Sequence, residues 1–160
     1  MAIHIVLVEP EIPPNTGNIA RSCAATDSVL HLVKPLGFNI DDKSLKRAGL
    51  DYWEYVEVAV YETLGEFMER NESRRMFLAT TGGTKTYTDV AYADGDMILF
   101  GRETAGLPKD FIAAMEEKSP GCSIRIPMGE STGLRSLNLS NSVAIVMFEA
   151  LRQMGFPGLK

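Results

Sequence analysis

This chain of 160 residues has few of the residues that build metal centres and disulfide frameworks. It contains two cysteines, Cys23 and Cys122, and two histidines, His4 and His31. The cysteines are far apart in the sequence and form no CxxC pair, and none of the four residues has metal-ligand spacing. We therefore expect no bound metal, and reduced thiols of the kind found in cytoplasmic proteins.

Long apolar runs and the common nucleotide-binding fingerprints are also missing. No apolar run approaches the length that a membrane-spanning helix needs, so we expect no membrane partner. The first ten residues, MAIHIVLVEP, lack a basic region and reach Glu9 too early for a signal peptide. Neither GxGxxG nor GxxxxGK[ST] occurs, which argues against a dinucleotide fingerprint and a P-loop.

The chain has no excess of basic residues, since its formal net charge is −5. Taken alone, this charge argues mildly against a nucleic-acid partner, although a local patch can act independently of the total. One short segment gathers basic residues, and three arginines lie beside loop-forming motifs. For any single one of these residues, a solvated surface charge is an equally good interpretation. The residues are Lys43, Lys46, Arg47, Arg21, Arg102 and Arg135.

The sequence does contain a regular alternation of apolar runs and helical patterns. Its length and its 45% hydrophobic content are those of one globular domain, residues 1–160. Pro13 and Pro14 are expected to exclude a helix before Asn15, whose side chain would cap it. Alternating strands and helices predict an α/β fold with a parallel sheet. Strands are predicted at 3–8, 29–33, 56–60, 76–80, 97–100 and 123–128, and helices at 15–24, from 41 or 42 to 46, 63–70, 108–116 and from 136 to a stop at Gly155.

Three polar, glycine-containing loops follow strands and should therefore meet at the carboxyl edge of the sheet: Asn15–Arg21, Gly101–Pro108 and Gly129–Asn141. In parallel α/β proteins this edge is where ligands bind. The helix amides of the first loop, together with Arg21, would suit an anionic group. Tyr52, Trp53 and Tyr55 are expected to serve packing or oligomer contacts, with base stacking as the less favoured alternative.

The same loops carry three long motifs that resemble those of the SPOUT RNA methyltransferases. They are PNTGNIAR at 14–21, FGRETAGLP at 100–108, and IRIPM at 124–128 followed by RSLNLSN at 135–141. The EPEIPPNTGNIAR start and the AGLDYWEY segment resemble the branch that methylates the ribose of cytidine or uridine 34 in tRNA. Only the loop Gly129–Leu134 departs from the family by being longer.

The resemblance implies more about the fold than periodicity does. Periodicity alone predicts an unknotted doubly wound sheet. The family instead has a Rossmann-like three-layer domain with a deep C-terminal trefoil knot, which is rare among protein topologies. The resemblance also implies a homodimer that packs through the first and last helices. Because no RNA-binding domain is appended, we expect the dimer surface to recognise the RNA.

By the same resemblance, the cofactor is S-adenosyl-L-methionine, without a metal, and the substrate is the wobble nucleotide of tRNA, with tRNA-Leu isoacceptors as the expected substrates. Alternatives are methylation at another tRNA or rRNA position and a non-catalytic RNA-binding protein of the same fold. The implied catalytic residues are Arg21, Asn15, Glu103 and Asn138. The implied cofactor-binding residues are Ala79, Gly101, Ile126 and Ser136, and candidate phosphate contacts are Lys43, Lys46 and Arg47.

Overall fold

The computed structural model describes residues 2–41, 52–130 and 133–160. Seven parallel strands form one sheet in the order β3-β2-β1-β6-β4-β7-β5. The strands are β1 (His4–Val8), β2 (Val29–Val33), β3 (Val58–Tyr61), β4 (Met76–Ala79), β5 (Lys85–Thr86), β6 (Met97–Phe100) and β7 (Ser123–Arg125). The helices are α1 (Pro13–Ala25), α3 (Leu64–Arg70), α4 (Lys109–Lys118) and α5 (Leu139–Gln153), with a short 3₁₀ helix, η1 (Trp53–Tyr55).

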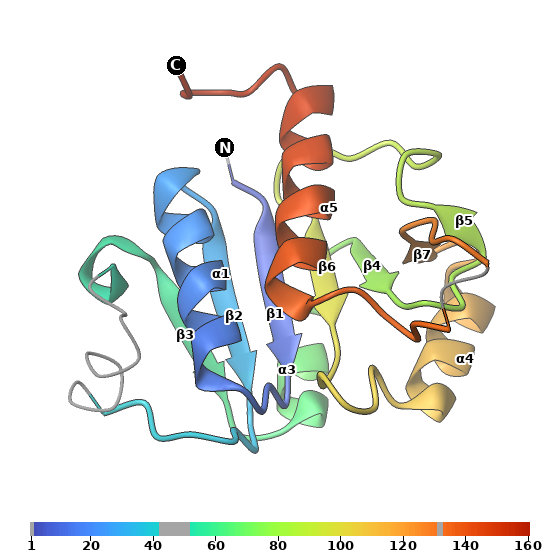
Figure 1. The fold of residues 1–160 in the computed structure, drawn as a ribbon, viewed down its shortest axis with the longest axis horizontal. Helices are drawn as coiled ribbons and strands as arrows, with labels where there is room; N and C mark the ends of the chain where they lie inside the picture. The colour runs from blue at the N-terminus through green and yellow to red at the C-terminus, as the bar shows by residue number, and fades with distance from the viewer. Residues whose placement is uncertain (1, 42–51, 131–132) are drawn as a thin grey trace.

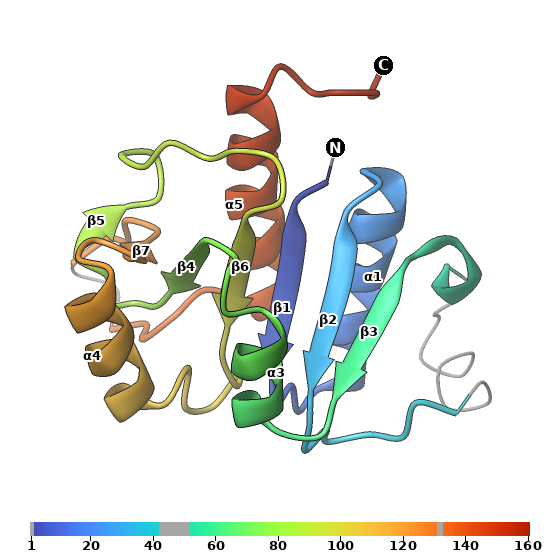
Figure 2. The ribbon, with the colours of Figure 1, turned by 180° about the vertical axis from the view of Figure 1, so that it is seen from behind.

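Helices cover both faces of the sheet, as the predicted three-layer α/β fold requires. In Figure 1, α1 and α5 lie side by side on the face that points toward the viewer. Figure 2 shows α3 and α4 on the opposite face. None of the described helices is both long enough and apolar enough to cross a membrane.

Strand β1 lies inside the sheet, and its residues after His4 are all apolar. Ile5 and Leu7 are buried in the core beneath α1 and α5, whereas Val6 and Val8 are buried in the core on the other face. Strand side chains alternate between faces, and both faces of a doubly covered sheet exclude water. The strand predicted at 3–8 is therefore confirmed, and the structure buries it on both faces.

Helix α1 begins earlier than the sequence predicts. It starts at Pro13, and its N-cap residue, Ile12, makes no side-chain cap hydrogen bond. The expectation that the prolines exclude a helix before Asn15 is wrong, because first-turn N–H groups have no intrahelical acceptor to lose. The expectation that Asn15 caps this helix is also wrong, which leaves its side chain available for other contacts.

The last third of the chain differs in two boundaries from the prediction. Strand β7 ends at Arg125, two residues before Pro127, a residue that cannot donate to a strand ladder. Helix α5 begins at Leu139 instead of 136, because the Asn138 side chain accepts from the backbone N–H groups of Ser140 and Asn141 and caps it. Strand β5 was missed because two residues carry no readable pattern. The helix predicted to begin at 41 or 42 lies, beyond Asp41, outside the described residues.

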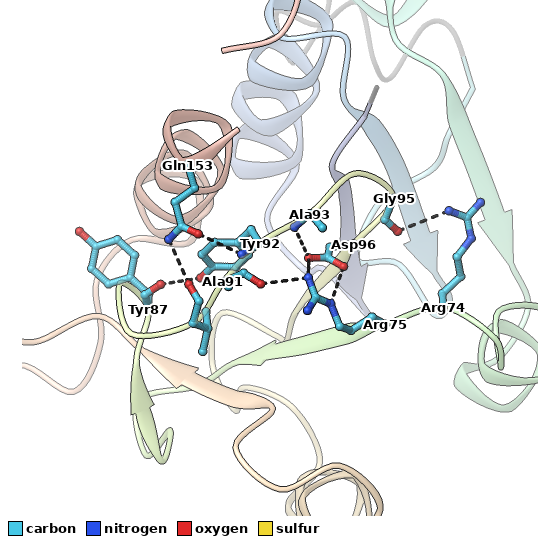
Figure 3. A network of polar contacts seen from close by, with 10 residues as sticks. Arg74, Arg75, Tyr87, Ala91, Tyr92, Ala93, Gly95, Asp96 and Gln153 are labelled. Atoms are coloured by element: carbon cyan, nitrogen blue, oxygen red, sulfur yellow. Dashed lines mark hydrogen bonds and ion pairs between the residues drawn. The ribbon is translucent and has the colours of Figure 1, made fainter. Parts of the chain in front are cut away.

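A polar network fixes the opposite, amino-terminal edge of the sheet (Figure 3). Arg75 donates to both carboxylate oxygens of Asp96 and to the carbonyl of Ala91. Gln153, the last residue of α5, donates to the Val90 carbonyl at 3.0 Å and accepts from the Tyr92 N–H at 2.9 Å. This network ties the segment before β6 to the end of α5.

The rings of His4, which is half-buried, and His31, which is buried, are both partnered. His4 Nδ1 and His31 Nε2 are 2.8 Å apart, and His31 Nδ1 lies 3.0 Å from the Tyr61 hydroxyl. Burial, followed by the neighbouring His4 and Arg74 charges, lowers the pKa of His31 to about 4. Burial also lowers the pKa of His4. Both rings are therefore neutral near pH 7.

The C-terminal knot remains a prediction from the resemblance. The course of the chain is compatible with it: β7 lies between β4 and β5, and the chain then returns to α5 on the α1 face (Figure 1). The same course brings the third motif back to the carboxyl edge of β1 and β6.

Candidate functional site

The loop after β6 folds back on itself at the carboxyl edge of the sheet. Arg102 and Gly106 exchange two backbone hydrogen bonds, of 3.2 and 2.8 Å. A Cβ added at Gly101 would lie 2.0 Å from the Gly106 carbonyl carbon. The need for glycine at 101 therefore comes from the return of this loop, and its predicted contact with a cofactor remains a prediction.

One polar residue from each motif joins a single hydrogen-bonded line. Glu103 Oε1 accepts from Asn15 Nδ2 at 3.3 Å, and Asn15 Oδ1 accepts from Asn138 Nδ2 at 3.1 Å. Asn138 Oδ1 in turn accepts from Ser140 and Asn141 at the start of α5. The line connects the loop after β6 to the first turns of α1 and α5, so the three motifs hold one another in place.

The anionic group at the start of α1 is the carboxylate of Glu103. It accepts from the backbone N–H of Glu11 at 2.8 Å and from that of Ile12 at 3.0 Å. The sequence predicted an anion at the amides of the helix expected from Asn15, whereas this carboxylate of the protein itself binds the two N–H groups just before α1.

A second brace joins the same two loops. Arg102 donates through Nε to the Glu9 carboxylate at 2.6 Å, and the Thr104 hydroxyl donates to Glu11 at 2.8 Å. The segment after β1 and the loop after β6 are thus held together by four side chains as well as by Glu103.

A cavity of about 530 Å³ lies beside this line, within the range that small-molecule and cofactor sites occupy. Its wall includes all four predicted cofactor-binding residues and three of the predicted catalytic residues. These are Ala79, Gly101, Ile126, Ser136, Asn15, Glu103 and Asn138. The structure therefore brings together residues from four strand ends that the sequence could only place at the same edge.

Arg21 does not belong to this group. Its side chain is exposed on α1, and its guanidinium carbon lies 4.8 Å from the centre of the Tyr52 ring. It does not line the cavity of its own chain. The predicted RNA contacts, Lys43, Lys46 and Arg47, lie outside the described residues.

The three aromatic residues Tyr52, Trp53 and Tyr55 lie in different environments. Trp53 packs against the core, Tyr52 is half-buried beneath Arg21, and the Tyr55 side chain is 74% exposed. Trp53 therefore makes the packing contact that the sequence favours, whereas the Tyr52 ring contacts the Arg21 guanidinium.

Sequence reasoning missed several residues of the cavity wall. Thr80 and Thr81 follow β4, Lys109 begins α4, and Arg125 ends β7. The two threonines could have been predicted, because they come directly after a parallel strand and therefore lie at the edge of the sheet where the cavity is. Nothing comparable marked Lys109, because its approach to the cavity depends on where α4 packs. No group of three or more His, Cys, Asp or Glu that could hold a metal occurs in residues 2–41, 52–130 and 133–160.

Comparison with known proteins agrees with this geometry. Residues 2–148 match the model of the SpoU rRNA Methylase family. A putative tRNA (cytidine(34)-2'-O)-methyltransferase of Geobacillus stearothermophilus is 50% identical over 99% of both chains. The tRNA (cytidine(34)-2'-O)-methyltransferase of Escherichia coli K12 is 49% identical over 98% of this chain and 96% of its own.

Solved structures give the same result. A putative RNA methyltransferase from Bacillus anthracis superposes with a TM-score of 0.87 at 49% identity, covering 99% of this chain and 98% of its own. A protein studied for the 2-OH methylation of C/U34 on tRNA superposes with a TM-score of 0.85 at 38% identity, covering 96% and 97%. With the three motifs gathered at one cavity and a family match over nearly its whole length, this chain belongs to the SpoU rRNA methylase family.

Proposed function

We propose that this protein transfers a methyl group to the ribose 2′-hydroxyl of nucleotide 34 in tRNA, where the base is cytidine or uridine. The observation that carries the proposal is the hydrogen-bonded line Glu103–Asn15–Asn138 beside the cavity. The names of relatives about half identical over nearly their full length support this choice of substrate. The buried free thiols of Cys23 and Cys122 support a cytoplasmic location.

The cavity fits S-adenosyl-L-methionine as the methyl donor. Its volume suits a nucleoside-sized molecule, and Ile126 and Leu139 offer an apolar wall for an adenine ring. At Gly106 a Cβ would meet nothing within 4 Å, so this backbone faces open space at the cavity wall. When bound, the cofactor supplies a methyl group that is attached to a positively charged sulfur. Because the leaving group is a neutral thioether, the transfer requires no metal.

The protein's part in the reaction is to align the hydroxyl and assist loss of its proton. A ribose hydroxyl has a pKa of roughly 12, so complete ionisation at pH 7 would cost about 7 kcal/mol. A neighbouring group must therefore polarise or accept this proton as the oxygen bonds to the methyl carbon. We assign Asn138 and Ser136 to orienting the ribose and the cofactor, and Glu103 and Asn15 to holding the loops. Alignment of the two reacting atoms would supply much of the rate.

Arg21 is assigned to the phosphate next to the target ribose, where its planar guanidinium can pair bidentately with the phosphate oxygens. Because it normally stays protonated and has no acceptor atom, it acts by orienting the substrate and not as a base. In its own chain Arg21 lies away from the cavity. We therefore infer that it serves the cavity of a partner subunit.

A homodimer through α1 and α5 would bring it there. Ile145 and Phe148 are 37% and 47% exposed on α5, and Asn18 and Arg21 are exposed on the neighbouring α1. An apolar patch beside polar functional residues is typical of an oligomer interface.

Transfer of labelled methyl from S-adenosyl-L-methionine to bulk tRNA, followed by mapping of the modified nucleotide, tests the activity. We expect label on the ribose of nucleotide 34. Label at another position would support a different RNA target, and RNA binding without transfer would support a non-catalytic member of the fold. Arg21→Ala should abolish transfer while cofactor affinity stays nearly unchanged, and an equal loss of cofactor binding would contradict the assigned role.

Mixing two inactive variants tests the subunit arrangement. Dimers that combine Arg21→Ala with Asn138→Ala contain one intact site if the two residues come from different chains. About a quarter of the wild-type activity should then return in a random mixture, because half of the dimers are hybrids. No recovery would place both residues in one chain's site.

A further inference from the structure

The cavity mouth is basic although the whole protein is acidic. The net charge is −5, yet among the described residues the side chains around the cavity include four that are basic, Arg102, Lys109, Arg125 and Arg135, and only one that is acidic, Glu103. A cationic opening on an acidic protein focuses the field on anions that approach this opening.

Two of these five charges are already engaged. Glu103 accepts two backbone N–H groups and the Asn15 side chain, and Arg102 is paired with Glu9. Within the described residues, Lys109, Arg125 and Arg135 have no acidic partner within ion-pair distance. All three are exposed, and we call them the cation rim.

Lys109 and Arg125 are placed in ways that their own elements do not require. Lys109 opens α4, where the positive end of the helix dipole disfavours a cation, whereas Lys118 occupies the favourable last turn. Arg125 donates to the Gly83 carbonyl at 2.8 Å, which holds its guanidinium group beside the cavity while leaving other N–H groups free to donate. Their positions concentrate positive charge at the opening.

We propose that the cation rim binds phosphates of the substrate RNA on either side of the nucleotide that enters the cavity. This inference rests on the proposed function. Three separate cations exceed what one cofactor carboxylate can use, whereas a single RNA strand presents one phosphate per nucleotide along its path. Charged contacts of this kind fix the register of the strand without reading its sequence.

Salt dependence of RNA binding tests the rim directly. The probe is a synthetic anticodon stem-loop RNA, and its affinity is measured by fluorescence anisotropy over a series of salt concentrations. The slope of log K against log salt is negative, and each lost phosphate contact reduces its magnitude by about 0.7 for a single strand. The double variant Lys109→Gln, Arg135→Gln should therefore reduce the magnitude of the slope by about 1.4 and weaken binding most at low salt.

The matched control is Lys118→Gln with Lys160→Gln. It also removes two positive charges, but from exposed positions that do not line the cavity, and Lys118 lies on the same helix as Lys109. The control should keep the wild-type slope. A rim variant with an unchanged slope, or a control that lowers the slope equally, would overturn the proposal.

Two further measurements distinguish RNA binding by the rim from cofactor binding by the rim, and test the rim separately from the proposed function. Calorimetry with S-adenosyl-L-methionine should give the same affinity for the rim variant and the wild type. Loss of cofactor affinity with an unchanged RNA slope would assign the rim to the cofactor and overturn the proposal. Because binding is measured without methyl transfer, a wild type that binds through the rim but transfers no methyl would refute the proposed function and leave the rim supported.

Discussion

Replacing Glu103 by glutamine tests whether one carboxylate holds the motifs together. Oε2 accepts from the Glu11 N–H at 2.8 Å, and Oε1 accepts from the Ile12 N–H at 3.0 Å and from Asn15 Nδ2 at 3.3 Å. A glutamine oxygen can keep the second pair, but its NH₂ group would then face the Glu11 N–H. One hydrogen bond is lost, and the other two weaken because the acceptor no longer carries a charge.

Hydrogen bonds to charged groups contribute roughly 1.5–3 kcal/mol each, and the partly exposed setting argues for the lower end. We therefore expect Glu103→Gln to lower the free energy of unfolding by about 2 kcal/mol. Urea titration measures this change, and methyl transfer is assayed at a temperature where the variant stays folded. Transfer should fall as well, because Asn15 and Asn138 lose their common anchor.

Glu11→Gln is the matched control. Its carboxylate accepts a hydrogen bond from the Thr104 hydroxyl at 2.8 Å, and a glutamine oxygen can still accept that bond. The free energy of unfolding should change by less than about 0.5 kcal/mol. If Glu103→Gln unfolded as the control does, the carboxylate would not be holding the two loops, and our account of the site would be refuted.

Three other changes probe other parts of the structure. Lowering the pH should destabilise the protein through His31: its folded pKa of about 4 lies below its ordinary 6.5, so the stability is complete above pH 6.5 and falls by about 3 kcal/mol toward pH 4. Urea midpoints across this range measure the loss, and a flat profile in that window would contradict the buried, neutral ring. Asn138→Ala should cost about 1 kcal/mol through loss of the α5 cap, and Asn138→Ser should restore stability but not methyl transfer, because the bond to Asn15 stays broken. Equal recovery of both would show that Asn138 acts only as a cap. Phe148→Glu should convert the proposed homodimer into monomers in sedimentation experiments, and an unchanged mass would exclude this face of α5 as the interface.

The elements of this fold were largely predictable because their patterns are local. The apolar run of β1 follows from burial on both faces, and Gly155, with φ of +76°, ends α5 close to the predicted stop. The failures were also local in origin. Pro13 and Pro14 were assigned as helix breakers, whereas the first turn of a helix tolerates both, and β5 is too short to leave a periodic signal.

The cavity was predictable only as a location. Parallel strands place the loops that follow them at one edge, so the motifs had to lie near one another. Which atoms meet was not predictable: Glu103 and Asn15 are 88 residues apart, and Asn15 and Asn138 are 123 apart. Their contacts depend on how far each helix extends and on the return of the loop after Gly101.

The sequence by itself therefore determined the alternating strands and helices, the family motifs and the edge of the sheet where they gather, because each is written in neighbouring residues. Only the tertiary structure decided that Glu103 binds the N–H groups just before α1, that Arg21 lies away from its own cavity, and that three cations without an acidic partner among the described residues surround the opening. Those outcomes depend on contacts between distant segments, and packing fixes such contacts after the local pattern has been set.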